Sequence, residues 1–244
     1  MEGDPIRDNV PQVFDLYLVG SQRILSLWDR FVRSPVSRLT RASPIVESAV
    51  TRNEYIFLPR GPRPASRNPY DRMLAMHVRR GDYSANCVHL AKWSSRFFSW
   101  SQLEFLPDRF EPPAGASWGE NTPENEAIYM QRCLPSVEQM VSRARQVRED
   151  YGKPLDVLYL LTNEQGEWLD GLKAAMIKEG WSTIRTSRDL RLDQEQMEVN
   201  GAVDAEIARK AAVFIGNGVS AVFVPVYLIL TAIKVVLVYE QHCA

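Results

Sequence analysis

Cysteine and histidine are scarce in this chain of 244 residues, which contains three of each. Three cysteines are too few for a disulfide framework, and neither they nor the histidines show the spacing of a zinc site. Two readings stay open for Cys87 and Cys133: a bridge formed in an oxidising compartment, or two small buried thiols. The sequence therefore predicts no metal site.

An excess of charge of either sign is also missing, because the chain contains 29 Lys and Arg residues and 30 Asp and Glu residues. A balanced surface does not attract nucleic acid or an anionic membrane over a broad area. Nucleic acid is therefore not expected as a partner, and any function of positive charge must be local.

A signal-peptide pattern is absent from residues 1–20, which have no continuous apolar core after a basic start. The apolar run is instead at residues 219–238, and ~20 such residues are long enough to span a bilayer. Pro225 and Lys234 interrupt this run, and its many β-branched residues favour buried core segments. A C-terminal membrane anchor is kept as the less favoured alternative.

The first part of the chain has helical character. Apolar residues recur at intervals of three and four over residues 13–32, and a second short helix is predicted for PIVESAVTRN at 44–53. Residues 60–72 are rich in Pro, Arg and Ser without periodicity, which predicts an exposed linker. The predicted organisation is a partial helical segment over 1–59, this linker, and one domain over 73–244.

From residue 73 onward, short apolar runs alternate with helical patterns. Strands are predicted at MLAMHV (73–78), DVLYLLTN (156–163), STIRTS (182–187) and VFIGN (213–217), and helices at 164–180 and 203–212. Near-continuous apolar strands that alternate with helices are typical of a parallel sheet covered on both faces. The predicted fold class is therefore α/β, a Rossmann-like doubly wound parallel sheet. Residues 84–120 are expected to be irregular.

A long helix is predicted to begin near Pro123, which suits the first helical position, with Asn121 or Thr122 as its cap. Pro135 should kink or restart this helix, and Ser136 can cap the second part.

The motif HVRRGD, at residues 77–82, directly follows the first predicted strand of the sheet. Ligands of open parallel sheets bind outside the carboxyl ends of the strands. Arg79 and Arg80 carry the planar, permanently charged group that pairs best with a pyrophosphate. Gly81 allows a tight turn close to a ligand, and Asp82 can orient an arginine or pair with a bound group. The alternative is a solvated, charged sheet edge.

Two further loops are predicted to meet the same edge. Thr162 and Glu164 flank the end of the second strand, and Gly216–Ser220 follows the last one. Gly216 and Gly218 can form a turn whose amide groups face an anion, with Ser220 opening a helix there. Asp204 lies on the preceding helix, where its simplest reading is a charge near a helix N-terminus.

The order HVRRGD, YLLTNE and VDAEIARKAAVFIGNGVS resembles the three-motif pattern of the GDP-fucose fucosyltransferases, and is most similar to fungal O-fucosyltransferase-like proteins. The resemblance covers residues 55–220. It implies a GT-B fold whose C-terminal domain holds GDP-fucose, a glycan or protein hydroxyl as acceptor, inversion at the sugar, and no divalent metal. It also implies the ER or Golgi lumen for the full-length protein.

The resemblance assigns roles to single residues. Arg79 would hold the β-phosphate and take the charge-neutralising part of a magnesium ion, Asp204 would lie at the guanine end, and Glu164 is the candidate base. The donor site predicted in this way consists of His77, Arg79, Arg80, Gly81, Asp82, Thr162, Asp204, Gly216, Asn217, Gly218 and Ser220.

Two departures from the family pattern bear on activity. About seventy residues precede the HVRRGD strand, fewer than a complete first GT-B domain requires. After Ser220 the chain continues with Ala221–Pro225 rather than a second Ser or Thr and a polar helix start. Fucosyl transfer is the leading hypothesis. The alternatives are a non-catalytic nucleotide-sugar-binding remnant and a tail-anchored membrane protein.

Overall fold

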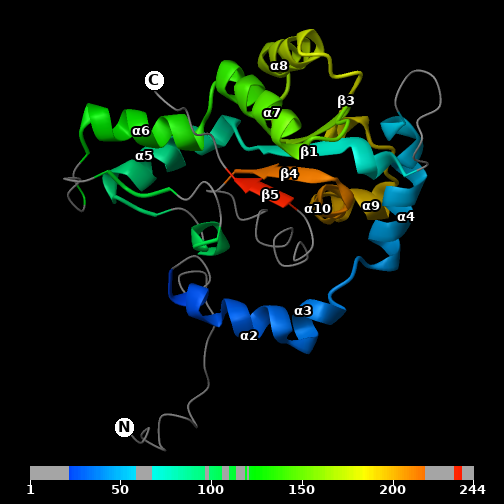
Figure 1. Cartoon of the computed structure of the whole chain (residues 1–244), viewed down its shortest axis with the longest axis horizontal. Helices are drawn as coiled ribbons and strands as arrows, with labels where there is room; N and C mark the ends of the chain where they lie inside the picture. Colours follow the sequence, from blue (N-terminus) through cyan, green and yellow to red (C-terminus); the bar gives the residue numbers. More distant parts are fainter. Residues whose placement is uncertain are drawn as a thin grey trace, which may run out of the picture.

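A five-stranded, all-parallel sheet forms the centre of the molecule (Figure 1). The computed structural model describes residues 22–58, 68–96, 99–105, 110–113, 119, 121–217 and 234–237. The strands are β1 (Met73–Val78), β2 (Val157–Thr162), β3 (Thr183–Thr186), β4 (Val213–Gly216) and β5 (Lys234–Leu237), and their order across the sheet is β3-β2-β1-β4-β5. This order is that of a Rossmann-like doubly wound sheet. The predicted fold class is therefore confirmed.

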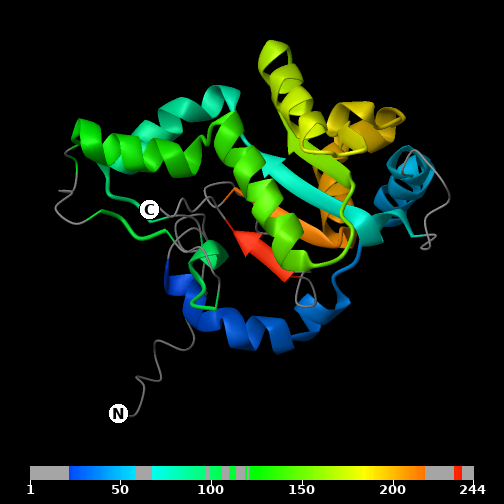
Figure 2. The ribbon, with the colours of Figure 1, turned by 45° about the horizontal axis from the view of Figure 1, so that its top comes forward.

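The strand register brings the predicted loops to one edge. Met73 pairs with Val157 and Val78 pairs with Thr162, so β1 and β2 end level with each other. The strand arrows point toward the side on which helices α5 and α6 lie (Figure 2). The segment after β1 therefore lies beside the segment after β2, as the strand patterns predict.

Helices cover both faces of the sheet. On one face lie α7 (Val137–Tyr151) and α8 (Glu167–Lys178); on the other lie α9 (Gln194–Glu198), α10 (Asn200–Lys210) and α4 (Pro44–Asn53) (Figure 1). All six residues of β1 are buried, as are the first five of β2. Strands covered on both faces need continuous apolar runs, which explains the sequence of these two strands.

The predicted helix start and restart are both confirmed. Helix α6 (Pro123–Cys133) begins after Thr122, whose Oγ1 accepts a hydrogen bond from the backbone N–H of Asn125. Helix α6 ends at Cys133, and α7 begins after Ser136, which forms a reciprocal capping box with Gln139. The proline interruption and the two caps thus divide this region into two helices.

One helix was not predicted. Residues 84–92, expected to be irregular, form helix α5 (Ser84–Lys92), which packs against α6. Its buried residues Cys87 and Ala91 are four apart and small, so they let the two helices approach closely. A disulfide joins Cys87 to Cys133 of α6, which decides between the two readings of these cysteines. Packing and the bridge stabilise a helix whose own periodic pattern is weak.

The N-terminal segment agrees with its prediction in part. Helix α4 has the predicted bounds, whereas the helix predicted over 13–32 is η2 (Gln22–Leu27), a 3-10 helix, followed by α2 (Trp28–Arg33). Residues 13–21 of the predicted helix lie outside the described part of the chain. Helix α3 (Pro35–Leu39) follows α2.

The linker prediction is wrong for residues 68–72 and is not addressed for residues 60–67, which lie outside the described ranges. Residues Pro69–Arg72 form the short 3-10 helix η4, in which Pro69 and Tyr70 are buried. The carbonyl oxygen of Tyr70 accepts a hydrogen bond from Ala212, which ties this turn to the start of β4. The remaining 3-10 helices in the described ranges are η3 (Glu54–Phe57), η5 (Gly81–Tyr83), η6 (Ser99–Gln102) and η7 (Ser187–Asp189).

The apolar run at 219–238 contributes a strand to the sheet. Its residues 234–237 form β5, which pairs in parallel with β4, and the rest of the run lies outside the described residues. Among the helices that the structure describes, none has both the length and the hydropathy needed to cross a membrane.

Candidate functional site

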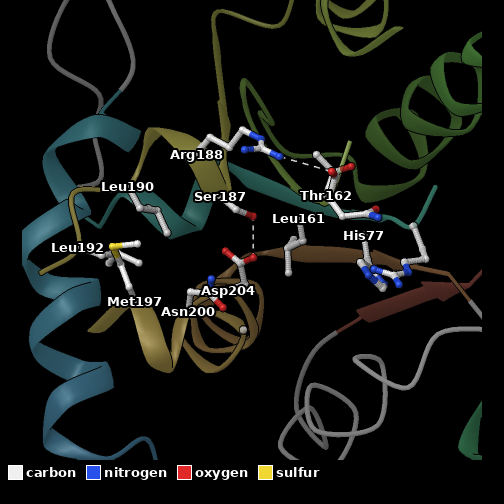
Figure 3. A pocket seen from close by; sticks show the side chains of 13 residues that line it. His77, Leu161, Thr162, Ser187, Arg188, Leu190, Leu192, Met197, Asn200 and Asp204 are labelled. Atoms are coloured by element: carbon white, nitrogen blue, oxygen red, sulfur yellow. Dashed lines mark hydrogen bonds between the residues drawn. The ribbon is translucent and has the colours of Figure 1, made fainter. Parts of the chain in front are cut away.

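A pocket of about 560 Å³ opens at the carboxyl edge of β1, β2 and β3 (Figure 3). Its walls come from the ends of β1 and β2, from η7 and the segment after it, and from α9 and α10. The lining residues are His77, Arg79, Leu161, Thr162, Asn163, Ser187, Arg188, Leu190, Leu192, Met197, Asn200, Gly201 and Asp204. Volumes of about 300–1,000 Å³ are usual for small-molecule sites.

The end of β1 supplies a neutral imidazole. His77 is only 8% exposed, and its Nδ1 has no hydrogen-bond partner among the described residues. Burial and, to a smaller extent, the charge of Arg79 lower the pKa of His77 to about 4. At neutral pH His77 is therefore uncharged, and its Nδ1 is buried without a partner among the described residues.

The two arginines of the motif lie in different places. Arg79 lines the pocket, and its guanidinium carbon is 5.4 Å from the centroid of the Tyr83 ring. The guanidinium of Arg80 instead donates a hydrogen bond to the carbonyl oxygen of Pro135 at 2.9 Å and lies 4.2 Å from the centroid of the Trp168 ring. The structure thus brings Arg79, but not Arg80, into the pocket wall. Arg80 holds the α6–α7 junction against α8.

The loops after β1 and β2 are joined to each other. The side chain of Asn163 accepts a hydrogen bond from the backbone N–H of Arg80 at 3.2 Å and donates one to its carbonyl oxygen at 3.1 Å. Next to Arg80, Gly81 has a φ of +67°, a left-handed conformation that glycine adopts without strain. The tight turn predicted at Gly81 is therefore present. Asp82 follows in η5, where the structure describes only its backbone.

Thr162 and Glu164 have different surroundings. The hydroxyl of Thr162 donates to the carbonyl oxygen of Val78 at 2.8 Å, and its Oγ1 accepts from the backbone N–H of Glu164 at 3.0 Å. Thr162 lines the pocket and also connects β1 to β2. Glu164 is not part of the described pocket wall, and its Oε1 accepts from the backbone N–H of Gln165.

Asp204 is the carboxylate of the described pocket wall. It lies in the second turn of α10, where Oδ1 accepts a hydrogen bond from the Tyr159 hydroxyl and Oδ2 accepts one from the Ser187 hydroxyl at 2.6 Å. Burial raises the pKa of Asp204 to about 6, although both hydrogen bonds act in the opposite direction. The simple reading of Asp204 as a charge at a helix N-terminus is therefore wrong, because its carboxylate is enclosed by polar partners.

Two partners of the pocket were missed by reasoning from the sequence. They are the two residues that donate hydrogen bonds to Asp204. Tyr159 has a polar hydroxyl group in the middle of the buried strand β2, and Ser187 is the first residue after β3. A polar atom inside a buried strand needs a partner, so Tyr159 was a detectable signal. Ser187 and its neighbour Arg188 stand at the carboxyl end of a strand, the same positional signal that identified His77 and Arg79.

The pocket has two chemically different ends. Leu190, Leu192 and Met197 lie on one side of Asp204, and His77 lies on the other (Figure 3). Arg188 and Thr162 border the top of the opening in this view. The site therefore combines an apolar slot, a carboxylate in the middle, and at the far end His77, whose pKa the nearby charge of Arg79 helps to lower.

The predicted loop after β4 is described only in part. Gly216 ends β4, and neither it nor Asn217 lines the pocket. Asn217 is buried, and its Nδ2 donates to the carbonyl oxygen of Cys133 at 3.2 Å. Gly218 and Ser220 lie outside the described residues. Within the described ranges, no group of three or more His, Cys, Asp or Glu side chains is arranged to hold a metal ion.

The sheet order and the position of the pocket define the class of fold, a Rossmann-like α/β domain with a pocket of nucleotide size at its carboxyl edge. No protein-family model matches the sequence, and no curated protein is detectably similar to it. Solved structures do match, and structures of POFUT1 are among them.

The structure of POFUT1 in complex with GDP-fucose superposes with a TM-score of 0.55 and 14% identity over 91% of this chain and 51% of that chain. The apo form gives a TM-score of 0.53 and 15% identity over 89% of this chain and 50% of that chain. The complex with GDP gives a TM-score of 0.54 and 13% identity over 89% of this chain and 52% of that chain. The chain thus shares its fold with the matched part of POFUT1 and spans about half the length of the POFUT1 chains that it matches.

Proposed function

We propose that the pocket binds the GDP part of GDP-fucose and that this chain forms the donor-binding half of an inverting fucosyltransferase. The observation that carries the proposal is the polarity of the pocket: Asp204 lies beside an apolar slot, and His77 lies at the opposite end, where the charge of Arg79 acts on its imidazole. A nucleoside diphosphate has the same polarity, with a flat base at one end and a dianionic pyrophosphate at the other.

Asp204 supports the choice of guanine as the base. The edge of guanine presents N1–H and an exocyclic amine, two neighbouring donors that match the two oxygens of a carboxylate. Adenine presents an acceptor at N1, which a carboxylate repels. Leu190, Leu192 and Met197 line the same end of the pocket and provide apolar contact for the faces of a purine ring.

Arg79 supports the reaction type. Fucosyl transfer builds positive charge on the sugar and negative charge on the departing GDP. A guanidinium held at the β-phosphate stabilises that leaving group more strongly in the transition state than in the ground state. In this proposal Arg79 takes the part that a magnesium ion plays in other transferases, and the absence of a metal requirement stays a prediction.

The acceptor is proposed to be a protein hydroxyl or a glycan, and the catalytic base is not assigned. Glu164, the candidate from the sequence, accepts a hydrogen bond from the neighbouring backbone rather than lining the pocket. This placement favours a second candidate function, the binding of a nucleotide sugar without transfer. The ER or Golgi lumen and the relation to fungal O-fucosyltransferase-like proteins stay predictions.

The test is isothermal titration of the chain with GDP, GDP-fucose and ADP, repeated on Arg79→Ala. We expect binding of both guanine nucleotides, no comparable binding of ADP, and a loss of affinity on the order of 10- to 100-fold in Arg79→Ala. The matched control is Arg145→Ala, which removes an exposed arginine that pairs with Glu179 across α7 and α8. This control should bind GDP as the wild type does.

Unchanged GDP affinity in Arg79→Ala would contradict the assignment of the phosphate end. Release of GDP from GDP-fucose, measured with peptide and glycan acceptors, separates the two candidate functions. Turnover that falls by about 10²- to 10³-fold in Arg79→Ala would support the transferase. Tight binding without any turnover would support the non-catalytic alternative.

A further inference from the structure

Three elements that are far apart in the chain meet at the carboxylate of Asp204. Tyr159 comes from β2, Ser187 from the start of η7, and Asp204 from α10. Each carboxylate oxygen accepts one hydrogen bond, Oδ1 from Tyr159 and Oδ2 from Ser187. No single segment could hold the carboxylate in this way, so its orientation is a product of the folded core.

Both donors belong to rigid parts of the structure. The Tyr159 side chain is fully buried, and its ring meets Phe57 edge-on with 5.4 Å between the centroids. Ser187 begins a turn that is closed by a reciprocal capping box between Thr186 and Asp189, with the Thr186 backbone N–H 2.7 Å from the Asp189 carboxylate. The hydroxyl groups therefore approach Asp204 from fixed directions.

The arrangement leaves capacity for a ligand. A carboxylate has about four lone-pair positions on its two oxygens. Tyr159 and Ser187 use one position on each oxygen, so each oxygen keeps one unused position, and Asp204 lines the pocket. Two acceptors held side by side fit two adjacent donors, and a carboxylate free to rotate would satisfy only one of them reliably.

We infer that Tyr159 and Ser187 are positioning residues that hold the Asp204 carboxylate for two-point recognition of a guanine edge, and that they set how strictly the pocket selects its base. This inference rests on the proposed binding of GDP. It assigns base selection to a unit of three residues rather than to Asp204 alone.

The charge state of Asp204 gives this unit a second measurable property. Recognition of two donors requires the ionised carboxylate, and both hydroxyl hydrogen bonds lower the pKa of Asp204 against the effect of burial. The other charged or titratable groups of the pocket wall are His77, Arg79 and Arg188. Loss of either hydroxyl should therefore raise the pKa of Asp204 above its present value of about 6.

The experiment compares GDP, IDP and ADP in titrations of the wild type, Tyr159→Phe and Ser187→Ala between pH 5 and pH 8. IDP lacks the exocyclic amine, so the ratio of its dissociation constant to that of GDP reports the second hydrogen bond. We expect this ratio to be about tenfold in the wild type and to fall toward one in both variants. The pH at which GDP affinity is half lost should move upward in both.

Matched controls remove the same groups elsewhere. Tyr129→Phe deletes a hydroxyl that donates to the carbonyl oxygen of Ser95, and Ser182→Ala deletes one that donates to the carbonyl oxygen of Asp156. Both should keep the wild-type ratio and pH profile. If Tyr159→Phe does not fold, Ser187→Ala carries the test, because Ser187 is only partly buried and its change removes a single oxygen.

The outcomes separate the inference from the proposal on which it rests. Variants that bind GDP with the wild-type base ratio and pH midpoint would overturn the positioning role and leave GDP binding intact. A wild type that binds no GDP would overturn both. A uniform loss of affinity for all three nucleotides, with the ratio unchanged, would show a structural role only and would also overturn the inference.

Discussion

The side-chain amide of Asn217 donates a hydrogen bond to the carbonyl oxygen of Cys133 at 3.2 Å, and both residues are buried. Asn217 directly follows β4, and Cys133 ends α6 and is bridged to Cys87 of α5. The end of a central strand is thus connected to two helices through one amide and one disulfide. Asn217 anchors the helices beside the sheet edge, and its contact with the nucleotide stays a prediction.

Removal of the disulfide should lower the stability of the whole domain. Cys87 and Cys133 are 46 residues apart, and a bridge over a loop of this length reduces the freedom of the unfolded chain. We expect the double variant Cys87→Ser, Cys133→Ser to lose roughly 2–4 kcal/mol of unfolding free energy. Urea titrations of the oxidised wild type and the variant measure this loss. Reductant should destabilise the wild type and leave the variant unchanged; equal stability of the two proteins would contradict the prediction.

The two arginines of the motif should respond differently to substitution. Arg80→Ala removes the contact with Trp168 and the hydrogen bond to Pro135, and should lower the unfolding free energy by about 1–3 kcal/mol. Arg79→Ala should change stability less and GDP affinity more. Thermal unfolding and GDP titration of both variants test this division. A larger loss of stability in Arg79→Ala than in Arg80→Ala would show that the roles are assigned the wrong way round.

Gly81→Ala isolates the cost of a left-handed turn. A Cβ at Gly81 would lie 3.6 Å from the Asn163 side chain, an ordinary contact, so the penalty comes from the φ of +67°. We expect a loss of roughly 1–2 kcal/mol. Gly171→Ala is the matched control, because Gly171 lies within α8 with open space around it. This substitution should raise the unfolding free energy by about 0.5–1 kcal/mol. Denaturant titrations give both values, and changes of the same sign would refute the argument.

Asp204→Asn should make the protein more stable at neutral pH while it removes GDP binding. The pKa of Asp204 is raised from 3.8 to about 6 in the folded state. A carboxyl group with a raised folded pKa binds its proton more tightly when folded, so its contribution to stability falls as pH rises from 3.8 to 6. Above pH 6 the ionised carboxylate destabilises the folded state by up to about 2 kcal/mol, after allowance for its partial exposure to the pocket.

The difference in stability between Asp204→Asn and the wild type should therefore grow between pH 4 and pH 6 and stay constant above it. His77 acts in the opposite direction in both proteins: its pKa is lowered to about 4, so stability is lost as pH falls from 6.5 toward 4. Because both proteins contain His77, its effect cancels in the difference. A difference that does not change with pH would show that the carboxyl is not perturbed in the folded protein.

The sequence carried enough information for the sheet and for the location of the site. The apolar runs that became β1 and β2, the capped helices after Thr122 and Ser136, and HVRRGD at the end of a strand are all local patterns. Helix α5 was missed because its stability comes from contact with α6 and from the disulfide, and not from its own periodicity.

The parts of the site that depend on side-chain direction were not predictable. Arg79 and Arg80 are adjacent and chemically identical, yet only Arg79 lines the pocket, because Trp168 and Pro135 hold the side chain of Arg80. Sequence patterns identify which residues reach an edge, and packing against elements far away in the chain decides where each one points.

What the sequence determined by itself is therefore the α/β class, the order of its strands along the chain, and the edge at which polar residues gather, since these follow from hydrophobic periodicity and from the chemistry of the residues after each strand. What only the tertiary structure decided is the polarity of the pocket. Asp204, Tyr159 and Ser187 are as far as 45 residues apart, and they meet because the crossover from β3 to β4 carries α10 to a position where Asp204 reaches the side chain of Tyr159 in β2 and that of Ser187 after β3.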